Sequence, residues 1–77
     1  MTITPAQCRA ARALLGWTQV SLGRKAYLGE STIRDFEAGR RVPAKNNLGA
    51  MAAALEAAGV EFATGGEWAV KLRKVVK

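Results

Sequence analysis

Apolar residues recur at intervals of three and four over most of the chain, which is the period of helices that bury one face. The pattern is most complete in the fourth segment, where Leu48, Met51, Ala52 and Leu55 occupy positions i, i+3, i+4 and i+7. Shorter segments of the same kind precede it. We therefore expect four helices, at about residues 5–15, 18–26, 30–38 and 45–58.

Several helix ends are marked by residues that suit helix termini. In the stretch TPAQ, Thr4 is an expected N-cap, Pro5 suits the first helical position and Gln7 completes a capping box. Thr18 is a second expected N-cap. Glycine, which readily adopts the left-handed conformation in which helices end, follows three of the segments, at Gly16, Gly39 and Gly59.

The apolar period changes to two near the C-terminus. Val60 and Phe62 precede the sequence TGGE, and Trp68, Val70 and Leu72 follow it in alternation with other residues. This alternation predicts a β-hairpin at about residues 60–76. The fold class is therefore mainly α, and the whole chain, residues 1–77, is expected to form a single domain.

The chain is strongly basic, with 12 Lys and Arg against 6 Asp and Glu, a formal net charge of +6 and a pI near 10.3. Such a charge favours an anionic partner, either nucleic acid or an acidic membrane surface, and we consider nucleic acid the better hypothesis. The alternative is that the charge serves only solubility. No apolar run is long enough for a membrane span.

The composition argues against an enzyme and against a cofactor. There is no histidine and one cysteine, so neither a common metal site nor a Cys/His nucleophile can be assembled. No glycine-rich loop suits a nucleotide phosphate. Cys8 lies among apolar positions and is expected to be a small core residue, and an unpaired cysteine favours the reducing cytoplasm.

The second and third predicted helices are separated by only a few residues, between Ala26 and Glu30. Two helices joined so tightly must cross at a steep angle, as in a helix-turn-helix. The second helix of that motif can enter a DNA major groove about 12 Å wide.

The stretches GWTQVSLGRKA and STIRDFEAGRRVP provide a more specific signal. Together they resemble the phage-repressor-like helix-turn-helix family, the Cro or XRE class, and the similarity spans residues 5–62. The shared pattern is a Thr-Gln pair opening the second helix, Thr-Ile in the third helix, and Glu-x-Gly with a later proline. The resemblance implies a four-helix lambda-repressor-like domain, here followed by the hairpin, that binds double-stranded DNA as a homodimer.

The resemblance also implies roles for individual residues. Gln19 corresponds to a glutamine that holds a phosphate, helped by the positive end of its helix. Glu37 corresponds to a glutamate that turns inward to pair with Arg12, and the alternative is an exposed, unpaired Glu37. The base-reading positions of the third helix correspond to Glu30, Ser31, Thr32, Arg34 and Asp35.

The chemistry of these side chains suggests how they would act. Arg34 is the best candidate to bind a guanine through its planar fork, and the alternatives are a phosphate contact or an ion pair with Glu30 or Glu37. Glu30 and Asp35 can accept from a cytosine amino group but would repel phosphates. Residues 9–45 hold eight basic side chains against three acids, so the local field can stay positive. Backbone anchors, or simply a solvated loop, are expected at Arg40, Arg41 and Lys45.

Two positions depart from the family pattern. Tyr27 stands where the family has glycine in the turn between the helices, and a non-glycine residue in a left-handed conformation costs about 1–2 kcal/mol. Gly29 replaces the Ser or Thr that caps the third helix. Glycine is only a slightly weaker N-cap than serine.

The hairpin offers apolar residues beyond those that a four-helix core needs. We expect it to pair with the same strand of a second copy and so form a dimer, and the alternative is a monomeric lid. The residues assigned to this dimerisation surface are Phe62, Trp68, Val70 and Leu72.

The sequence thus favours a DNA-binding transcriptional regulator, and more narrowly a dimeric repressor. Two alternatives stay open. One is a helix-turn-helix module that binds a protein, as an anti-activator or adaptor would, for which Tyr27, Gly29, Glu30 and Asp35 are the motivation. The other is an antitoxin that binds both DNA and a toxin.

Overall fold

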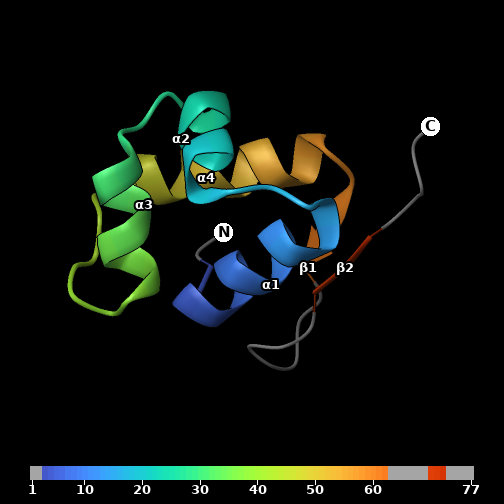
Figure 1. Ribbon diagram of the computed structural model, residues 1–77, viewed down its shortest axis with the longest axis horizontal. Helices are drawn as coiled ribbons and strands as arrows, with labels where there is room; N and C mark the ends of the chain where they lie inside the picture. The colour runs from blue at the N-terminus through green and yellow to red at the C-terminus, as the bar shows by residue number, and fades with distance from the viewer. Residues whose placement is uncertain (1–2, 63–69, 73–77) are drawn as a thin grey trace.

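The computed structural model describes residues 3–62 and 70–72, and it confirms the mainly helical fold. Four helices are followed by a two-stranded antiparallel sheet (Figure 1). The elements are α1 (Pro5–Leu15), α2 (Gln19–Ala26), α3 (Glu30–Glu37), α4 (Lys45–Ala57), β1 (Val60–Phe62) and β2 (Val70–Leu72).

The predicted helix bounds agree with these to within one residue. Helix α2 begins at Gln19 because Thr18 is its N-cap, with an extended backbone and a side chain that accepts from the Ser21 amide at 3.0 Å. Helices α3 and α4 end one residue early because Ala38 and Ala58 are C-caps. Capping residues flank a helix without belonging to it.

The capping box at the start of α1 is present as expected. The Thr4 hydroxyl accepts from the Gln7 amide at 3.0 Å, and the Gln7 side chain accepts from the Thr4 amide at 2.9 Å. Gly16 ends the same helix in the left-handed conformation, with φ 71°. Two orphan amides are thereby satisfied at the N-terminus, which fixes where α1 starts.

The core lies between the inner faces of the four helices and the sheet. Helix α2 contacts both α3 and α4, and β2 packs against α1. The sheet lies on the opposite side of the molecule from α3 (Figure 1). The largest fully buried side chains are Ile3, Cys8, Leu22, Ile33, Met51, Leu55 and Val60.

The hairpin prediction is met in the part of the chain that the structure describes. Val60 pairs with Leu72 and Phe62 pairs with Val70, in antiparallel register. Trp68, which was assigned to the dimerisation surface together with Phe62, Val70 and Leu72, lies outside the described residues.

The corner between α2 and α3 is unusually close. A Cβ atom on Gly23 would lie 2.7 Å from the carbonyl oxygen of Leu28, so only glycine fits there without a backbone shift. Tyr27 forms the turn with φ 59° and ψ 42°, the left-handed conformation that glycine would adopt freely. Gly29 is the N-cap of α3 and supplies no side-chain hydrogen bond. Both departures from the family pattern are therefore accommodated by the corner.

None of the helices in the described ranges is long and apolar enough to cross a membrane.

Candidate nucleic-acid interface

Helix α3 has one buried face and one exposed face. Ile33 and Phe36 lie in the core, where they anchor the helix to the body of the protein. On the other side Glu30, Ser31 and Arg34 are exposed, and Thr32 is half-buried at the edge. A short helix fixed in this way can present its outer side chains to a groove.

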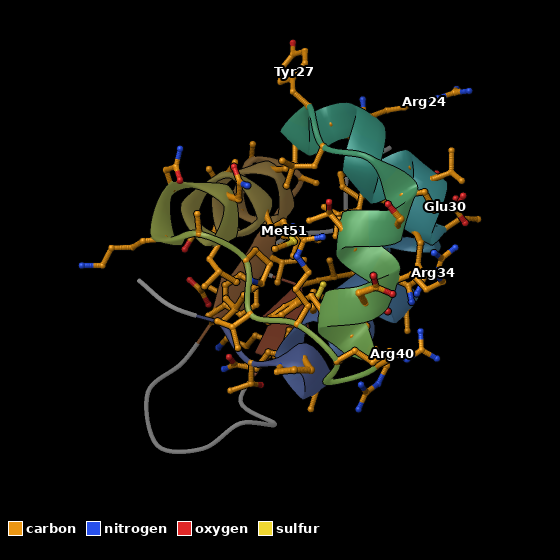
Figure 2. The ribbon with its side chains drawn as sticks, turned by 90° about the vertical axis from the view of Figure 1, so that its left-hand side faces the viewer. Arg24, Tyr27, Glu30, Arg34, Arg40 and Met51 are labelled. Carbon is orange, nitrogen blue, oxygen red and sulfur yellow. The ribbon has the colours of Figure 1, made fainter. Side chains whose placement is uncertain are left out.

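Basic side chains continue this exposed face beyond α3. Arg24 near the end of α2, Arg34 in α3 and Arg40 just after it lie along one side of the molecule (Figure 2). Arg41 and Lys45 are also exposed, in the loop and at the start of α4. The structure thus places one of the predicted anchors, Arg40, beside the predicted base-reading helix.

The acid Asp35 lies between two of these arginines. Its Oδ1 is 3.3 Å from Arg40 and 3.7 Å from the Nε of Arg34. The partner of Arg34 is therefore its neighbour in sequence, whereas the sequence had suggested Glu30 or Glu37. Pairing reduces the repulsion that this carboxylate would exert on a phosphate.

Glu30 is the first residue of α3, directly after the N-cap Gly29. A carboxylate there interacts favourably with the positive end of the helix dipole, by about 0.3–1 kcal/mol. This contribution suits a helix whose glycine cap offers no side-chain acceptor. Glu30 is exposed, so it is also accessible to a partner.

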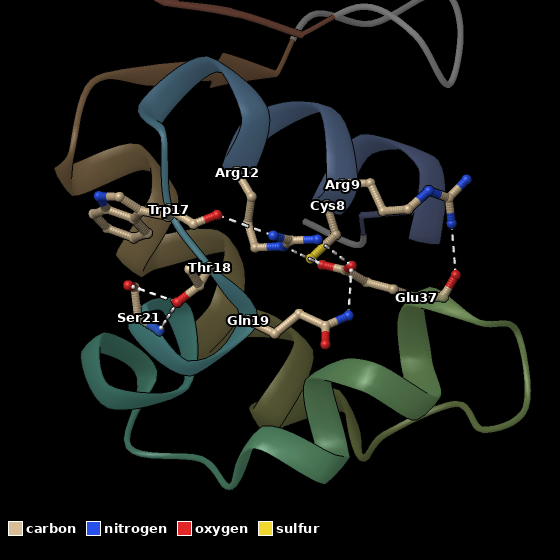
Figure 3. A network of polar contacts seen from close by, with 8 residues as sticks. All are labelled: Cys8, Arg9, Arg12, Trp17, Thr18, Gln19, Ser21 and Glu37. Atoms are coloured by element: carbon tan, nitrogen blue, oxygen red, sulfur yellow. Dashed lines mark hydrogen bonds and ion pairs between the residues drawn. The ribbon is translucent and has the colours of Figure 1, made fainter.

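Glu37, at the end of α3, lies at the centre of a buried polar network (Figure 3). Arg12 donates to both of its carboxylate oxygens at 2.7 Å, through Nε and Nη2. The remaining nitrogen of the same guanidinium, Nη1, donates to the carbonyl oxygen of Trp17 at 2.9 Å. Arg9 also donates to the Glu37 carbonyl oxygen. The structure thus brings the predicted structural pair together in a bidentate contact.

Two further side chains in this network were not assigned to it from the sequence. The amide of Gln19 donates to Glu37 Oε1 at 3.1 Å, and the Cys8 thiol approaches Glu37 Oε2 at 3.1 Å. Cys8 was expected only to fill the core, and Gln19 only to hold a phosphate. Their separations from Glu37 in sequence, 29 and 18 residues, are far beyond any helical repeat.

The network changes the ionisation of its members. Burial alone would raise the pKa of the Glu37 carboxyl, but hydrogen bonds from Arg12, Cys8 and Gln19 outweigh it and hold that pKa below its ordinary value. Burial, followed by the contact with Glu37, raises the pKa of the Cys8 thiol. Glu37 is therefore charged and Cys8 neutral at pH 7.

Three of the four residues assigned to dimerisation pack against the protein's own core. Phe62, Val70 and Leu72 are half-buried and pack against the hydrophobic cluster. Packing against the core therefore explains these three apolar residues of the hairpin, for which the sequence had suggested a second copy of the chain. Within residues 3–62 and 70–72, no group of three or more potential metal ligands is found.

This arrangement, a tight corner followed by an anchored and outwardly charged helix, is that of a helix-turn-helix protein. A helix-turn-helix family model of the Cro/XRE type matches residues 9–62, which is most of the chain. The chain belongs to this family, whose members are DNA-binding transcription regulators. A search of curated proteins finds no match.

Proposed function

We propose that the protein is a sequence-specific, dimeric repressor that inserts α3 into the DNA major groove. The observation that supports this most directly is the division of α3 into a core face, with Ile33 and Phe36, and an exposed face. Occupancy of an operator would then be sufficient for repression, without a catalytic step.

In this proposal the outer face of α3 distinguishes base pairs. Arg34, half of whose side chain is exposed, donates its fork to O6 and N7 of a guanine. Its 3.7 Å contact with Asp35 is weak, because an exposed ion pair contributes only about 0–1 kcal/mol, so the guanidinium is free to exchange partners. Shorter side chains, Ser31 and Thr32, contact neighbouring base edges, and Glu30 and Asp35 accept from cytosine.

Phosphate contacts hold the protein in place on either side of α3. Gln19 serves as one of them because its amide nitrogen has two hydrogens, and the contact with Glu37 uses one. In this proposal Glu37 orients the Gln19 amide toward a phosphate of the DNA. The positive end of α2, which begins at Gln19, adds to the attraction. On the other side the anchors are Arg40, Arg41 and Lys45.

The dimer would form through the hairpin. In the described part of the chain the sheet consists of β1 and β2, so a strand edge is available to the same strand of a second copy. A two-fold pair of domains could then set two α3 helices one DNA turn apart, about 34–36 Å. Phe62, Val70 and Leu72 would be shared between the domain's own core and this contact, together with Trp68.

The test is a salt titration of the purified protein against the DNA upstream of its own gene and against an unrelated duplex. Each phosphate contact should add about −0.9 to the slope of log affinity against log salt. A salt-independent affinity, or equal affinity for both duplexes at every salt concentration, would refute sequence-specific binding.

Two variants separate base contacts from phosphate contacts. Arg34→Ala should lower affinity for the operator by about 1–3 kcal/mol and relax the preference at one base pair. Arg40→Ala should lower the affinity for the operator and for the unrelated duplex equally. Sedimentation at several protein concentrations, with and without DNA, measures the dimer.

A further inference from the structure

The basic side of the molecule that includes Arg24 and Arg34 extends to the end of α2 and the turn after it. An open hollow of about 480 Å³ is lined by Ser21, Arg24, Lys25 and Tyr27, and we call these four residues the Tyr27 patch. Among the residues that the structure describes, the lining offers two cations and two hydroxyl groups and includes no acid.

The fold alone does not account for a tyrosine at this position. Tyr27 is strained because it holds a left-handed backbone with φ 59°, which glycine would adopt without strain. The residue is 94 % exposed, so burial of the ring contributes almost nothing to the stability of the protein. A strained and exposed aromatic residue is more simply explained by a contact with another molecule.

We propose that the Tyr27 patch binds the sugar-phosphate backbone of DNA at the edge of the groove that α3 enters. Arg, Lys, Ser and Tyr side chains are among the usual donors to phosphate oxygens, and all four are present here. The aromatic ring would lie against the sugar while its hydroxyl and the two cations reach the phosphate. This inference rests on the proposed function.

The position of the patch supports this partner. Tyr27 is in the turn that leads into α3, and Arg24 lies at the same end of the molecule, above Glu30 and Arg34 in Figure 2. The patch therefore continues the row of basic side chains that flank α3. The carbonyl oxygens of Gly23 and Arg24, which would repel an anion, already accept from the Leu28 and Tyr27 amides.

The experiment uses the full chain and a fluorescent duplex of mixed sequence, because a backbone contact does not depend on base sequence. Affinity is measured by anisotropy over a series of salt concentrations for wild type, Tyr27→Gly, and the double variant Arg24→Gln with Lys25→Gln. Lys71→Gln is the control, since it removes one exposed charge from β2, on the far side from α3, and sedimentation checks that it keeps the oligomeric state of wild type. Thermal unfolding is measured for every variant.

Tyr27→Gly should bind DNA about three- to tenfold more weakly, the range for an exposed polar contact, while its melting temperature stays the same or rises. For the double variant, the slope of log affinity against log salt should be shallower by about 1.8, since two phosphate contacts contribute about 0.9 each. Lys71→Gln should leave the slope unchanged.

Unchanged affinity and slope in both patch variants would overturn the proposal but leave the function of α3 intact. The same holds if a fluorescent oligoglutamate peptide binds wild type and not Tyr27→Gly, while DNA binds both equally; the patch would then serve an acidic protein. If wild type shows no salt-dependent binding to any duplex, the proposed function and this inference both fail.

Discussion

Two carboxylates of α3 lie two residues apart and have opposite environments. The side chain of Glu37 is 3 % exposed and meets the Arg12 guanidinium in two contacts of 2.7 Å. The side chain of Asp35 is 27 % exposed and has two looser partners, Arg34 and Arg40, at 3.3–3.7 Å. One faces the interior and the other the candidate DNA surface.

The difference shows why a count of charges says little about stability. A buried charge that loses its partner is destabilising by several kcal/mol because water cannot replace the partner. An exposed pair exchanges freely with water and salt, and contributes about 0–1 kcal/mol. The acids near α3 therefore need not weaken DNA binding: Glu37 is buried, Asp35 is paired with arginines, and Glu30 stabilises the helix start.

Removing the buried carboxylate should give the largest effect. Glu37→Ala leaves the Arg12 guanidinium without its main acceptor and is expected to lower the free energy of unfolding by about 3–5 kcal/mol. A domain of this size has a total of about 5–15 kcal/mol, so much of the variant would unfold on mild heating. Urea denaturation followed by circular dichroism measures the loss.

A double variant tests whether the charge, and not the space, is responsible. Arg12→Met combined with Glu37→Leu replaces both charges with apolar groups and should be more stable than Glu37→Leu alone, which fills the same space but leaves the Arg12 guanidinium unpaired. Equal stability of the double and single variants would show that the pair itself is not the source of the loss.

Acid should abolish the contribution of the Glu37 carboxylate to the free energy of unfolding in the wild type. Because the folded pKa of Glu37 is lowered, its stabilisation is complete above the ordinary glutamate pKa of about 4.3. This stabilisation is lost as the pH falls through the lowered pKa that Glu37 has in the folded protein. The stability of wild type should therefore approach that of Glu37→Gln below about pH 4, and a constant gap between the two proteins would contradict this account.

The thiol contact should have a smaller effect. Cys8→Ala removes the donor 3.1 Å from Glu37 Oε2, together with one buried sulfur atom, while the guanidinium remains in place. We expect a loss of about 1–2 kcal/mol, the range for a buried polar partner. Cys8→Ser, which keeps a donor in nearly the same volume, is the matched comparison and should retain more stability than Cys8→Ala.

Asp35, the half-buried carboxylate at the surface, should give the smallest effect. Asp35→Asn is expected to change the free energy of unfolding by less than about 1 kcal/mol, because its ion pairs are open to solvent. Affinity for mixed-sequence DNA should rise slightly as one negative charge is removed. A loss as large as that of Glu37→Ala would erase the contrast between the two carboxylates.

Much of the fold could be predicted because helices leave local signals. The capping box of Thr4 and Gln7, the N-cap Thr18 and the stripe of α4 involve residues within one or two turns of each other. The family resemblance added what local signals cannot, namely that Arg12 and Glu37 would meet. Neither source indicated that Cys8 and Gln19 would join them.

Those contacts could not be predicted from periodicity because they depend on how α1, α2 and α3 pack. A helical repeat relates residues three or four apart, whereas Cys8 and Glu37 are 29 apart. The shared position of Asp35 between Arg34 and Arg40 likewise depends on the loop after α3, which turns back toward the helix through the Arg40 amide and the Asp35 carbonyl at 2.9 Å.

The Glu37 network joins α1, the start of α2 and the end of α3 through directional hydrogen bonds. Helix α3 is consequently held against its neighbours before any partner binds. Ordering of flexible groups is one of the main entropic penalties of association, and here it has largely been met during folding. Sequence discrimination by so short a helix would then depend on rigidity as much as on the side chains that it displays.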